Sequence, residues 1–590
     1  MLLAEERQLL DAVTLDRPWE LITTFSTLKR EHPNDVRRAA AHIERHLREL
    51  GIPVEVHVPE LFLSLPGQAS VSAGGLTFAA KPMAMSAVFP QGLTAPLVYQ
   101  PSQYAANADD MFSSALLDGE VDVAGKIVVT EGFGMPGKIR ELERRGALGV
   151  IAINPGARAH WGICTSIWGT PDLHDLPRKP RVAVANVNRA DGDQLIELAR
   201  SGAPAVMVTE LEEGWFPSPV PVVTIPGSED PEAFVLLHGH YDSWDYGVGD
   251  NAVGDATLLE VARNLWNNRA GLRRSVRIAW WPGHSTGRYA GSTWYADHFA
   301  LELYRNCVAQ INCDSPGCRW ATEYKDVSVM AEATAWAANI IRDVTGQEMQ
   351  AERPVRAGDY SFNNIGLSGF FMLLSTMPDD LRAEKGYYAV GGCGGNIAWH
   401  TEDDTLDVAD RGILLKDIKI YLLSAYRTAN QTIIPFDYVQ ILDEFDQTLA
   451  EYGEGTGTAF NLSRAQDAVE ALRSDLRELM RAAGSLTGES LTSPQVRRVN
   501  AALITLARHL VQVNYTQSPA FFHDPAEHVP PLPDLAVLQT LPGADVSQRG
   551  FILTHATRGL NRLLAHLGDA RVAVRDALNH LELSVKGGTS

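Results

Sequence analysis

The sequence predicts an α/β fold, and three features of its central region support this. An apolar run at 235–237 is typical of a buried strand and ends in the polar segment 238–243. A second such run, at 275–281, ends at Pro282. Between the two runs, apolar residues recur at helical spacing: Leu258, Leu259, Ala262, Leu265 and Trp266. Strand, helix and strand in this order form a βαβ unit, and in open α/β sheets the loops after the strands make the site.

The composition is that of a globular protein with several domains. The chain has 590 residues, 45% of them hydrophobic and 21% charged, which favours about two to four domains. Its net charge of −21 disfavours nucleic-acid and anionic-membrane partners, because both attract basic surfaces. Five irregularly spaced cysteines do not make a disulfide framework. We expect a cytoplasmic protein, because the start of the chain does not resemble a signal peptide and no apolar stretch approaches about 18 residues.

Other segments show their own local patterns. Val54, Val56 and Val58 alternate with polar residues, as in a half-buried strand. A strand-like run at 125–129 is followed by a helix-like segment at 138–145. Near the end of the chain, four stretches have the apolar spacing of helices: 463–480, 494–513, 550–567 and 571–583.

Histidines and aspartates gather where the central strands end. His240 and Asp242 follow the first strand, and Asp250 lies in the glycine-rich loop after it. His284 follows the second strand, and Asp314 follows a third apolar run. Neutral imidazole and carboxylate are ligands for zinc and similar divalent ions. These loops therefore predict a divalent metal site.

The same motifs resemble those of the co-catalytic zinc aminopeptidase superfamily. They are His240-x-Asp242, Gly249-Asp250-Asn251, Gly283 with Gly291-Ser292, Asn312-x-Asp314 and His400-Thr401. The branch that looks most similar is that of glutamate carboxypeptidase II and its non-catalytic relative, the transferrin receptor. The resemblance implies a metallopeptidase-type mixed-sheet α/β/α sandwich, with an inserted protease-associated β-rich domain and a C-terminal helical domain.

The resemblance also implies domain boundaries. The catalytic domain would be discontinuous, at 1–95 and 223–434, and the protease-associated domain would occupy 96–222. Residues 435–590 would form a helical dimerisation domain, so we expect a homodimer.

The family pattern assigns roles to the metal-ligand candidates. Asp250 takes the place of the carboxylate that bridges two metals, and His240 and Asp314 complete one of the two sites. His400 belongs to the other site. Asp242 takes the place of the acid that orients the histidine ligand. We therefore expect one or two divalent ions, with zinc as the first choice.

The chain departs from the family at Gly283-His284-Ser285, where the family has Gly-Glu-Glu. In the family the first glutamate is the general base and the second binds a metal. A neutral imidazole has an unperturbed pKa of about 6.5, so His284 can act as the base, or it can turn inward and ligate the metal. Ser285 is a poor zinc ligand. We expect the site of His240 to be occupied, and that of His400 to be weak, empty or dependent on His284.

Four residues are candidates for substrate binding. Arg288 is a cation in the segment after the second strand, and Arg353, Arg356 and Tyr360 lie where relatives recognise the far end of the substrate. An arginine can hold a carboxylate through two parallel hydrogen bonds, although a surface ion pair is the alternative for each. The loop 160–170, which carries two tryptophans, either lines a substrate pocket or packs on the neighbouring domain.

Three functions are compatible with the sequence. The first is an atypical metal-dependent hydrolase that acts on an amide or peptide-like small substrate, with His284 in a changed role. The second is a metal-assisted lyase or cyclase on the same scaffold, in which the metal polarises a carbonyl without a water nucleophile. The third is a catalytically inactive, receptor-like homologue. The complete and ordered set of ligand candidates argues against the third function.

Overall fold

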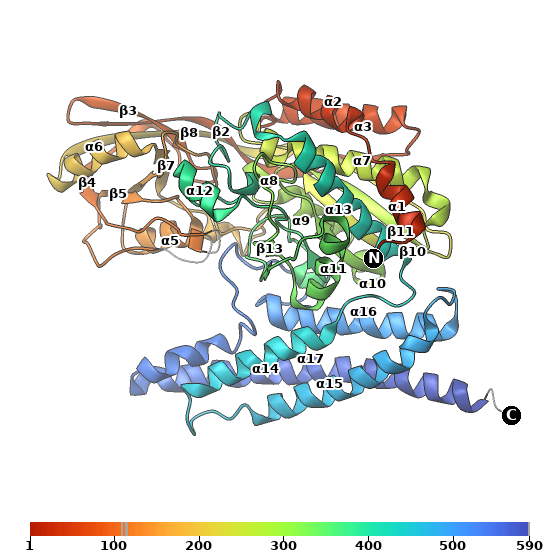
Figure 1. Ribbon diagram of the computed structural model, residues 1–590. Helices are drawn as coiled ribbons and strands as arrows, with labels where there is room; N and C mark the ends of the chain where they lie inside the picture. The colour runs from red at the N-terminus through yellow and green to blue at the C-terminus, as the bar shows by residue number, and fades with distance from the viewer. Residues whose placement is uncertain (108–109, 112–115, 588–590) are drawn as a thin grey trace.

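The computed structural model describes residues 1–107, 110–111 and 116–587. These residues form a central α/β part, a closed β-barrel at one side of it and a set of long helices below it (Figure 1). The predicted fold class is confirmed: a mixed sheet lies between helices, the β-rich part is inserted, and the C-terminal part is helical.

The central part is built on a mixed sheet with the strand order β1, β9, β11, β10, β12, β15. The last four are parallel to one another, and the first two run antiparallel to their neighbours. Their bounds are β1 (Glu55–His57), β9 (Val220–Ile225), β11 (Arg274–Trp281), β10 (Asp230–His240), β12 (Cys307–Asn312) and β15 (Gly369–Phe370). Because β10 lies between β11 and β12, its carboxyl end is flanked by the carboxyl ends of both.

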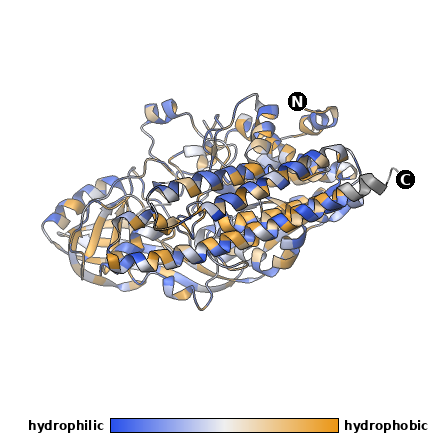
Figure 2. Cartoon of the chain, turned by 90° about the horizontal axis from the view of Figure 1, so that it is seen from below, coloured by the Kyte–Doolittle hydropathy of each residue, from blue (hydrophilic) through white to orange (hydrophobic). Residues whose placement is uncertain are grey.

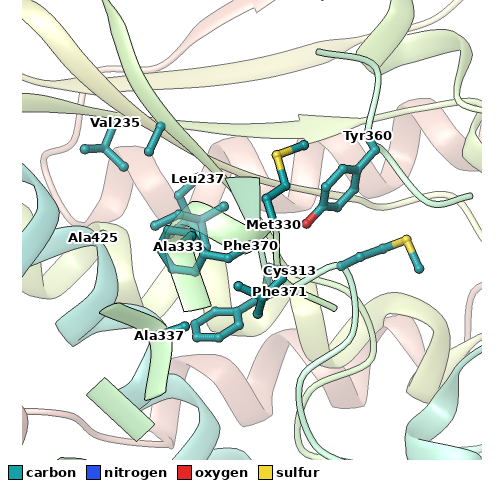
Figure 3. Close-up of a cluster of buried hydrophobic side chains, with 14 of the residues drawn as sticks. Val235, Leu237, Cys313, Met330, Ala333, Ala337, Tyr360, Phe370, Phe371 and Ala425 are labelled. Atoms are coloured by element: carbon teal, nitrogen blue, oxygen red, sulfur yellow. The ribbon is translucent and has the colours of Figure 1, made fainter. Parts of the chain in front are cut away.

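Helices cover both faces of the sheet. Successive side chains of a strand point to opposite faces, so the apolar residues of β10 lie alternately in two cores. Val235 and Leu237 lie in one core, and Phe234 and Leu236 lie in the other. Figure 3 shows part of the first core, where Val235 and Leu237 belong to the same cluster as Phe370. The first core includes α2 (Asp16–Phe25), α3 (Pro33–Glu49), α7 (Val253–Asn267) and α13 (Arg411–Asn430), and the second includes α9 (Ala290–His298) and α10 (Ala300–Asn306).

Short elements complete the central part. They are α1 (Ala4–Asp11), α8 (His284–Gly287), α11 (Thr334–Thr345), α12 (Asp379–Lys385), β13 (Val327–Ser328) and β14 (Ala351–Glu352). The helix α8 begins at His284, after the two residues Pro282 and Gly283 that follow β11, so the predicted departure from the family pattern lies at the edge of the sheet where the strands end.

The inserted part is a closed barrel that begins earlier than the predicted boundary at 96. Its strand order is β2-β3-β7-β6-β5-β4-β8. The first strand already belongs to it, because β2 pairs with β8 along most of its length. The bounds are β2 (Glu60–Ala73), β3 (Leu76–Pro82), β4 (Phe89–Tyr99), β5 (Ile127–Glu131), β6 (Gly149–Ile153), β7 (Ala183–Val187) and β8 (Pro204–Pro217), with helices α5 (Pro136–Arg144) and α6 (Arg189–Arg200).

The C-terminal part consists of long helices that run side by side, as Figure 2 shows from below. They are α14 (Tyr438–Glu454), α15 (Ser463–Ala483), α16 (Pro494–Tyr515) and α17 (Val546–Gly587). The two helices predicted at 550–567 and 571–583 form one helix. Gly568 between them costs a helix only about 1 kcal/mol, and the flanking Leu567 and Ala570 are buried. Dimerisation through this part stays a prediction.

In the part of the chain that the structure describes, no helix combines the length and the apolar character that crossing a bilayer requires.

Candidate metal centre

Three strand ends bring the predicted ligands together. His240 is the last residue of β10, Asp314 lies two residues after β12, and His284 follows β11. Parallel strands place their carboxyl ends at one edge of a sheet. One donor atom from each of these residues lies within 4.8 Å of the other two.

Asp250 lies between two histidines, as the bridging role requires. Its Oδ1 is 2.9 Å from Nε2 of His240, and its Oδ2 is 3.0 Å from Nε2 of His400. Both His240 Nε2 and Asp250 Oδ1 are buried, and neither has a hydrogen bond of acceptable geometry. Buried donor atoms that face each other without such a bond fit a shared cation, and imidazole with carboxylate is a donor set that zinc accepts.

The loop that carries Asp250 is held by residues that the sequence did not single out. The carboxylate of Asp404 accepts the backbone N–H groups of Gly249 at 2.6 Å and Asp250 at 3.0 Å. Burial raises the pKa of Asp404 to about 7. The Asn251 side chain donates to the carbonyl of Cys313 at 2.9 Å, which ties this loop to the end of β12. Asp404 was missed because it stands in the acidic run 402–404, and only its burial distinguishes it.

Asp242 anchors the turn after β11 and touches His240 as well. Its carboxylate accepts the backbone N–H groups of His284 at 3.0 Å and Ser285 at 2.9 Å. The Nδ1 of His240 lies 3.0 Å from the backbone carbonyl of Asp242 and 3.7 Å from its carboxylate. Asp242 therefore contacts the histidine mainly through its carbonyl, and its carboxylate positions the start of α8.

His284 is oriented by a carboxylate of its own. Its Nδ1 lies 2.9 Å from Oδ2 of Asp359, and Ser292 donates to the other oxygen of that carboxylate at 2.6 Å. Burial acts to raise the pKa of Asp359, but the interactions with His284 bring it below its usual value. Since Nδ1 is engaged, Nε2 is the nitrogen that remains for chemistry. The Asp359–His284 pair was not predicted from the sequence.

The ring of His284 is stacked on the ring of His240. Their centroids are 3.7 Å apart and their planes differ by 15°. Imidazole lone pairs lie in the ring plane, so stacked rings direct their nitrogens side by side instead of toward one point. Of the two roles open from the sequence, this geometry favours a base beside the metal over a ligand that shares the ion with His240.

The barrel loop 160–170 forms hydrogen bonds on two sides of this centre, directly with His400 and through two serines toward His284. The backbone N–H of Trp161 donates to the carbonyl of His400 at 2.8 Å, and Nδ1 of His400 lies 3.1 Å from the carbonyl of Trp161. On the other side, the Trp168 indole donates to Ser361 at 2.9 Å, and Ser361 lies 2.8 Å from Ser292. A hydrogen-bonded row therefore runs from Trp168 through Ser361, Ser292 and Asp359 to His284.

A cavity of about 750 Å³, including its open mouth, lies between the barrel and the central part. The ligand candidates Asp250, Asp314 and His400 line it together with His284. Its remaining walls are mostly apolar and come from both parts: Met83, Phe133, Met135, Trp161, Ile163, Trp244, Tyr289, Met372 and Trp399. The loop 160–170 thus packs on its neighbour and also lines the pocket.

Only one of the four predicted substrate residues lies in this cavity. Arg288 lines it and is 3% exposed. Arg353 lies elsewhere and donates to Glu444 at 2.7 Å and to the carbonyl of Asn514 at 2.6 Å, so it holds the helical part to the central part.

The other two are also outside the cavity lining. Arg356 donates to the carbonyls of Tyr360 at 3.1 Å and Asp524 at 3.0 Å, and its guanidinium lies 3.6 Å from the centre of the Trp168 ring. Tyr360 is fully buried among apolar side chains near Met330 (Figure 3). Arg353, Arg356 and Tyr360 therefore make packing contacts outside the lining of this cavity, and their contact with a substrate stays a prediction.

Comparison with known proteins supports the same architecture. Residues 222–424 match the model of peptidase family M28, and residues 93–195 match the PA domain. The probable glutamate carboxypeptidase VP8 of Zea mays is 23% identical over 50% of this chain and 43% of its own length. The chain thus spans less than half of that relative. These matches support the zinc aminopeptidase superfamily.

Two solved structures share the fold. An aminopeptidase from Aneurinibacillus sp. strain AM-1 is 20% identical, with a TM-score of 0.51 over 72% of this chain and 96% of its own. A zinc aminopeptidase from Bacillus subtilis is 19% identical, with a TM-score of 0.50 over 70% of this chain and 95% of its own. Together with the family match, these relatives support a metal-dependent peptidase.

Proposed function

We propose that this protein is a metal-dependent hydrolase of a peptide-like small substrate, in which His284 replaces the usual glutamate base. The observation that carries the proposal is the position of Asp250. Its two carboxylate oxygens face His240 and His400, at the wall of a cavity that also contains His284. A purely structural role for one histidine or one aspartate would not explain why these side chains face one another at the cavity wall.

The metal would be held by His240, Asp250 and Asp314, with His400 on the far side of Asp250. When bound, a divalent ion supplies Lewis acidity that polarises a carbonyl and stabilises developing negative charge. Ser285 stands where the family pattern has a metal-binding glutamate, so the metal position beside His400 lacks that carboxylate ligand. Two carboxylates face Nε2 of His240, that of Asp250 at 2.9 Å and that of Asp314 at 3.7 Å, and Nε2 of His400 lies 3.0 Å from the shared Asp250. We therefore infer that the His240 side binds metal more tightly than the His400 side.

His284 would move the proton. Its Nε2 takes a proton from the attacking water and returns it to the leaving nitrogen when the amide bond breaks. Asp359 holds Nδ1, which fixes the tautomer and keeps the ring in place, as a carboxylate does for a catalytic histidine in other hydrolases. Asp242 supports the same group, because its carboxylate binds the backbone N–H of His284.

The experiment is hydrolysis of a panel of aminoacyl and N-acyl dipeptide reporters by the full chain, before and after chelation. We expect turnover that is lost on removal of the metal and restored by zinc. Asp250→Asn should be inactive, whereas Asp407→Asn, which removes an equal charge from an exposed side chain, should resemble the wild type.

Other outcomes would contradict the proposal. A protein that binds metal but hydrolyses none of the reporters would favour a lyase or cyclase. A protein that binds no metal would favour a receptor-like role.

A further inference from the structure

We propose that Arg288 binds a carboxylate group of the substrate and thereby selects acidic over neutral ligands. This inference rests on the proposed function, since it names the class of substrate that enters the same cavity. It concerns one wall of the cavity, where Arg288 lies with Ile163 and Tyr289.

Arg288 is a buried cation with few hydrogen-bond partners. Its side chain donates to the carbonyl of Ile163 at 2.6 Å and interacts with the Tyr289 side chain, and its Nε is buried without a partner. In the described part of the chain it forms no ion pair. Burial lowers its pKa, and the groups that oppose this are Tyr289 and Cys164, neither of which is a carboxylate. A buried charge without a counter-ion is unfavourable, so a ligand that supplies the anion would be bound strongly.

Other buried arginines in this protein show what a structural arginine looks like. Arg30 donates to five backbone carbonyls, those of Phe25, Leu28, Tyr241, Tyr246 and Gly247. Arg508 donates to four, those of Leu303, Tyr304, Gly366 and Cys307. Arg288 has a single carbonyl acceptor. The backbone contacts that hold Arg30 and Arg508 are therefore mostly missing at Arg288, which, unlike Arg356, lines the cavity.

The backbone at Arg288 and at the next residue adopts a strained conformation. Arg288 has φ of 43° and Tyr289 has φ of 70°, both in the left-handed region that residues other than glycine disfavour. Strained residues of this kind cluster at ligand sites, where the surrounding contacts hold them in place.

A carboxylate is the anion that fits this wall. Guanidinium groups bind carboxylates through two parallel N–H donors, either Nε with one terminal nitrogen or both terminal nitrogens. The neighbouring lining is apolar, with Met83, Ile163 and Met372, so water does not compete well for the guanidinium. A neutral amide in the same place would leave the buried charge unpaired.

The test is binding of N-acetylalanine and of its neutral amide to the metal-loaded full chain, measured by calorimetry. We expect wild type to bind the acid at least tenfold more tightly than the amide. Arg288→Gln should abolish this preference, with its metal content unchanged. The control Arg305→Gln removes a charge from an exposed arginine of the same part and should keep the preference.

Equal binding of acid and amide by wild type would overturn the proposal, and so would a preference that survives Arg288→Gln. If Arg288→Gln fails to fold, Arg288→Lys carries the test, because lysine keeps the charge but not the paired donors. A severalfold loss of preference supports the proposal, and an unchanged preference refutes it. Calorimetry measures binding of ligands that are not hydrolysed. The preference for the acid can therefore fail while the reporters are hydrolysed, or hold while they are not, so failure of this proposal is distinguishable from failure of the proposed function.

Discussion

The two sides of the metal centre are built in different ways. The ligand side consists of His240, Asp250, Asp314 and His400, which face one another at distances of 2.9 to 3.7 Å. The base side consists of His284 and the row of hydrogen bonds that runs through Asp359, Ser292 and Ser361 to Trp168. The ligand side depends on residues close to the strand ends, whereas the base side extends into the barrel.

Under the proposed function, this difference would let the scaffold keep its metal chemistry while its proton-transfer group changes. The ligand side matches the pattern of the resembled family. The predicted departure from that family is on the base side, where the His284 imidazole has its own carboxylate partner in Asp359. Changes on the two sides should therefore separate metal binding from turnover.

The largest effect is expected from the ligand side. Asp250→Asn removes the carboxylate that two histidines face, so both metal and hydrolysis should be lost. Turnover should fall by roughly three orders of magnitude or more, as expected when several kcal/mol of charge stabilisation disappear. Elemental analysis and reporter hydrolysis measure the two losses. A variant that loses activity but keeps the wild-type metal content would contradict the bridging role.

Asp359→Asn should affect the base side alone. Without the carboxylate at Nδ1, His284 loses the partner that fixes its tautomer, and kcat should fall by about 10- to 100-fold. The metal content should stay at the wild-type level, since Asp359 is not among the ligand candidates. Steady-state kinetics separate kcat from KM, and a change in KM alone would contradict the assignment. Asp403→Asn, at an exposed position, is the matched control.

Trp168→Phe tests the far end of the same row. Phenylalanine keeps an aromatic ring beside Arg356 but cannot donate to Ser361. Loss of one hydrogen bond, worth about 1 kcal/mol, should lower kcat about fivefold. Trp215→Phe, at a largely exposed tryptophan of the barrel, should have no effect. Unchanged kcat in Trp168→Phe would mean that the base side ends at Ser361.

Glu229→Gln should leave both sides unaffected and change stability only. The Glu229 carboxylate accepts hydrogen bonds from Arg273 at 2.7 Å and from Leu491 at 2.7 Å, and so links the central and helical parts. The hydrogen bond with Arg273 lowers the pKa of Glu229 from 4.5 to about 2. Because the folded pKa is lowered, the stabilisation is complete above pH 4.5 and is lost as the pH falls toward 2.

Urea unfolding measures this contribution. At pH 7 the variant should be less stable by about 1 kcal/mol, the upper range for a partly exposed ion pair. The difference should shrink below pH 4.5. A difference that stays constant down to pH 3 would contradict the assignment, and a change in turnover would show that the helical part influences the site.

The proximity of the ligand candidates could be predicted from the sequence because it follows from local patterns, whereas their role as ligands stays a prediction. His240 and Asp314 end apolar runs that become neighbouring parallel strands, so their meeting follows from the strand order. The base side was harder to predict. Trp168, Ser292 and the segment that carries Asp359 and Ser361 lie far apart in the chain, and only tertiary packing shows that they form one row with His284.

Other differences have equally specific causes. Arg353 has the right charge for substrate binding, but Glu444 of the helical part neutralises it, and no pattern near Arg353 reveals that partner. The barrel begins before residue 96 because β2 is long and pairs with β8, a contact between distant segments. The alternation of Val54, Val56 and Val58 correctly predicted β1, whose pairing with β9 keeps it in the central sheet.

The measurement that tests the central claim most directly is the metal content of His284→Ala beside that of His240→Ala, together with the turnover of each. We predict that His284→Ala keeps the wild-type metal content and loses hydrolysis by about 10²- to 10⁴-fold, the range for a general acid–base group. His240→Ala should lose both. If His284→Ala loses metal as His240→Ala does, His284 is a ligand, and the separation between the two sides of the site is wrong.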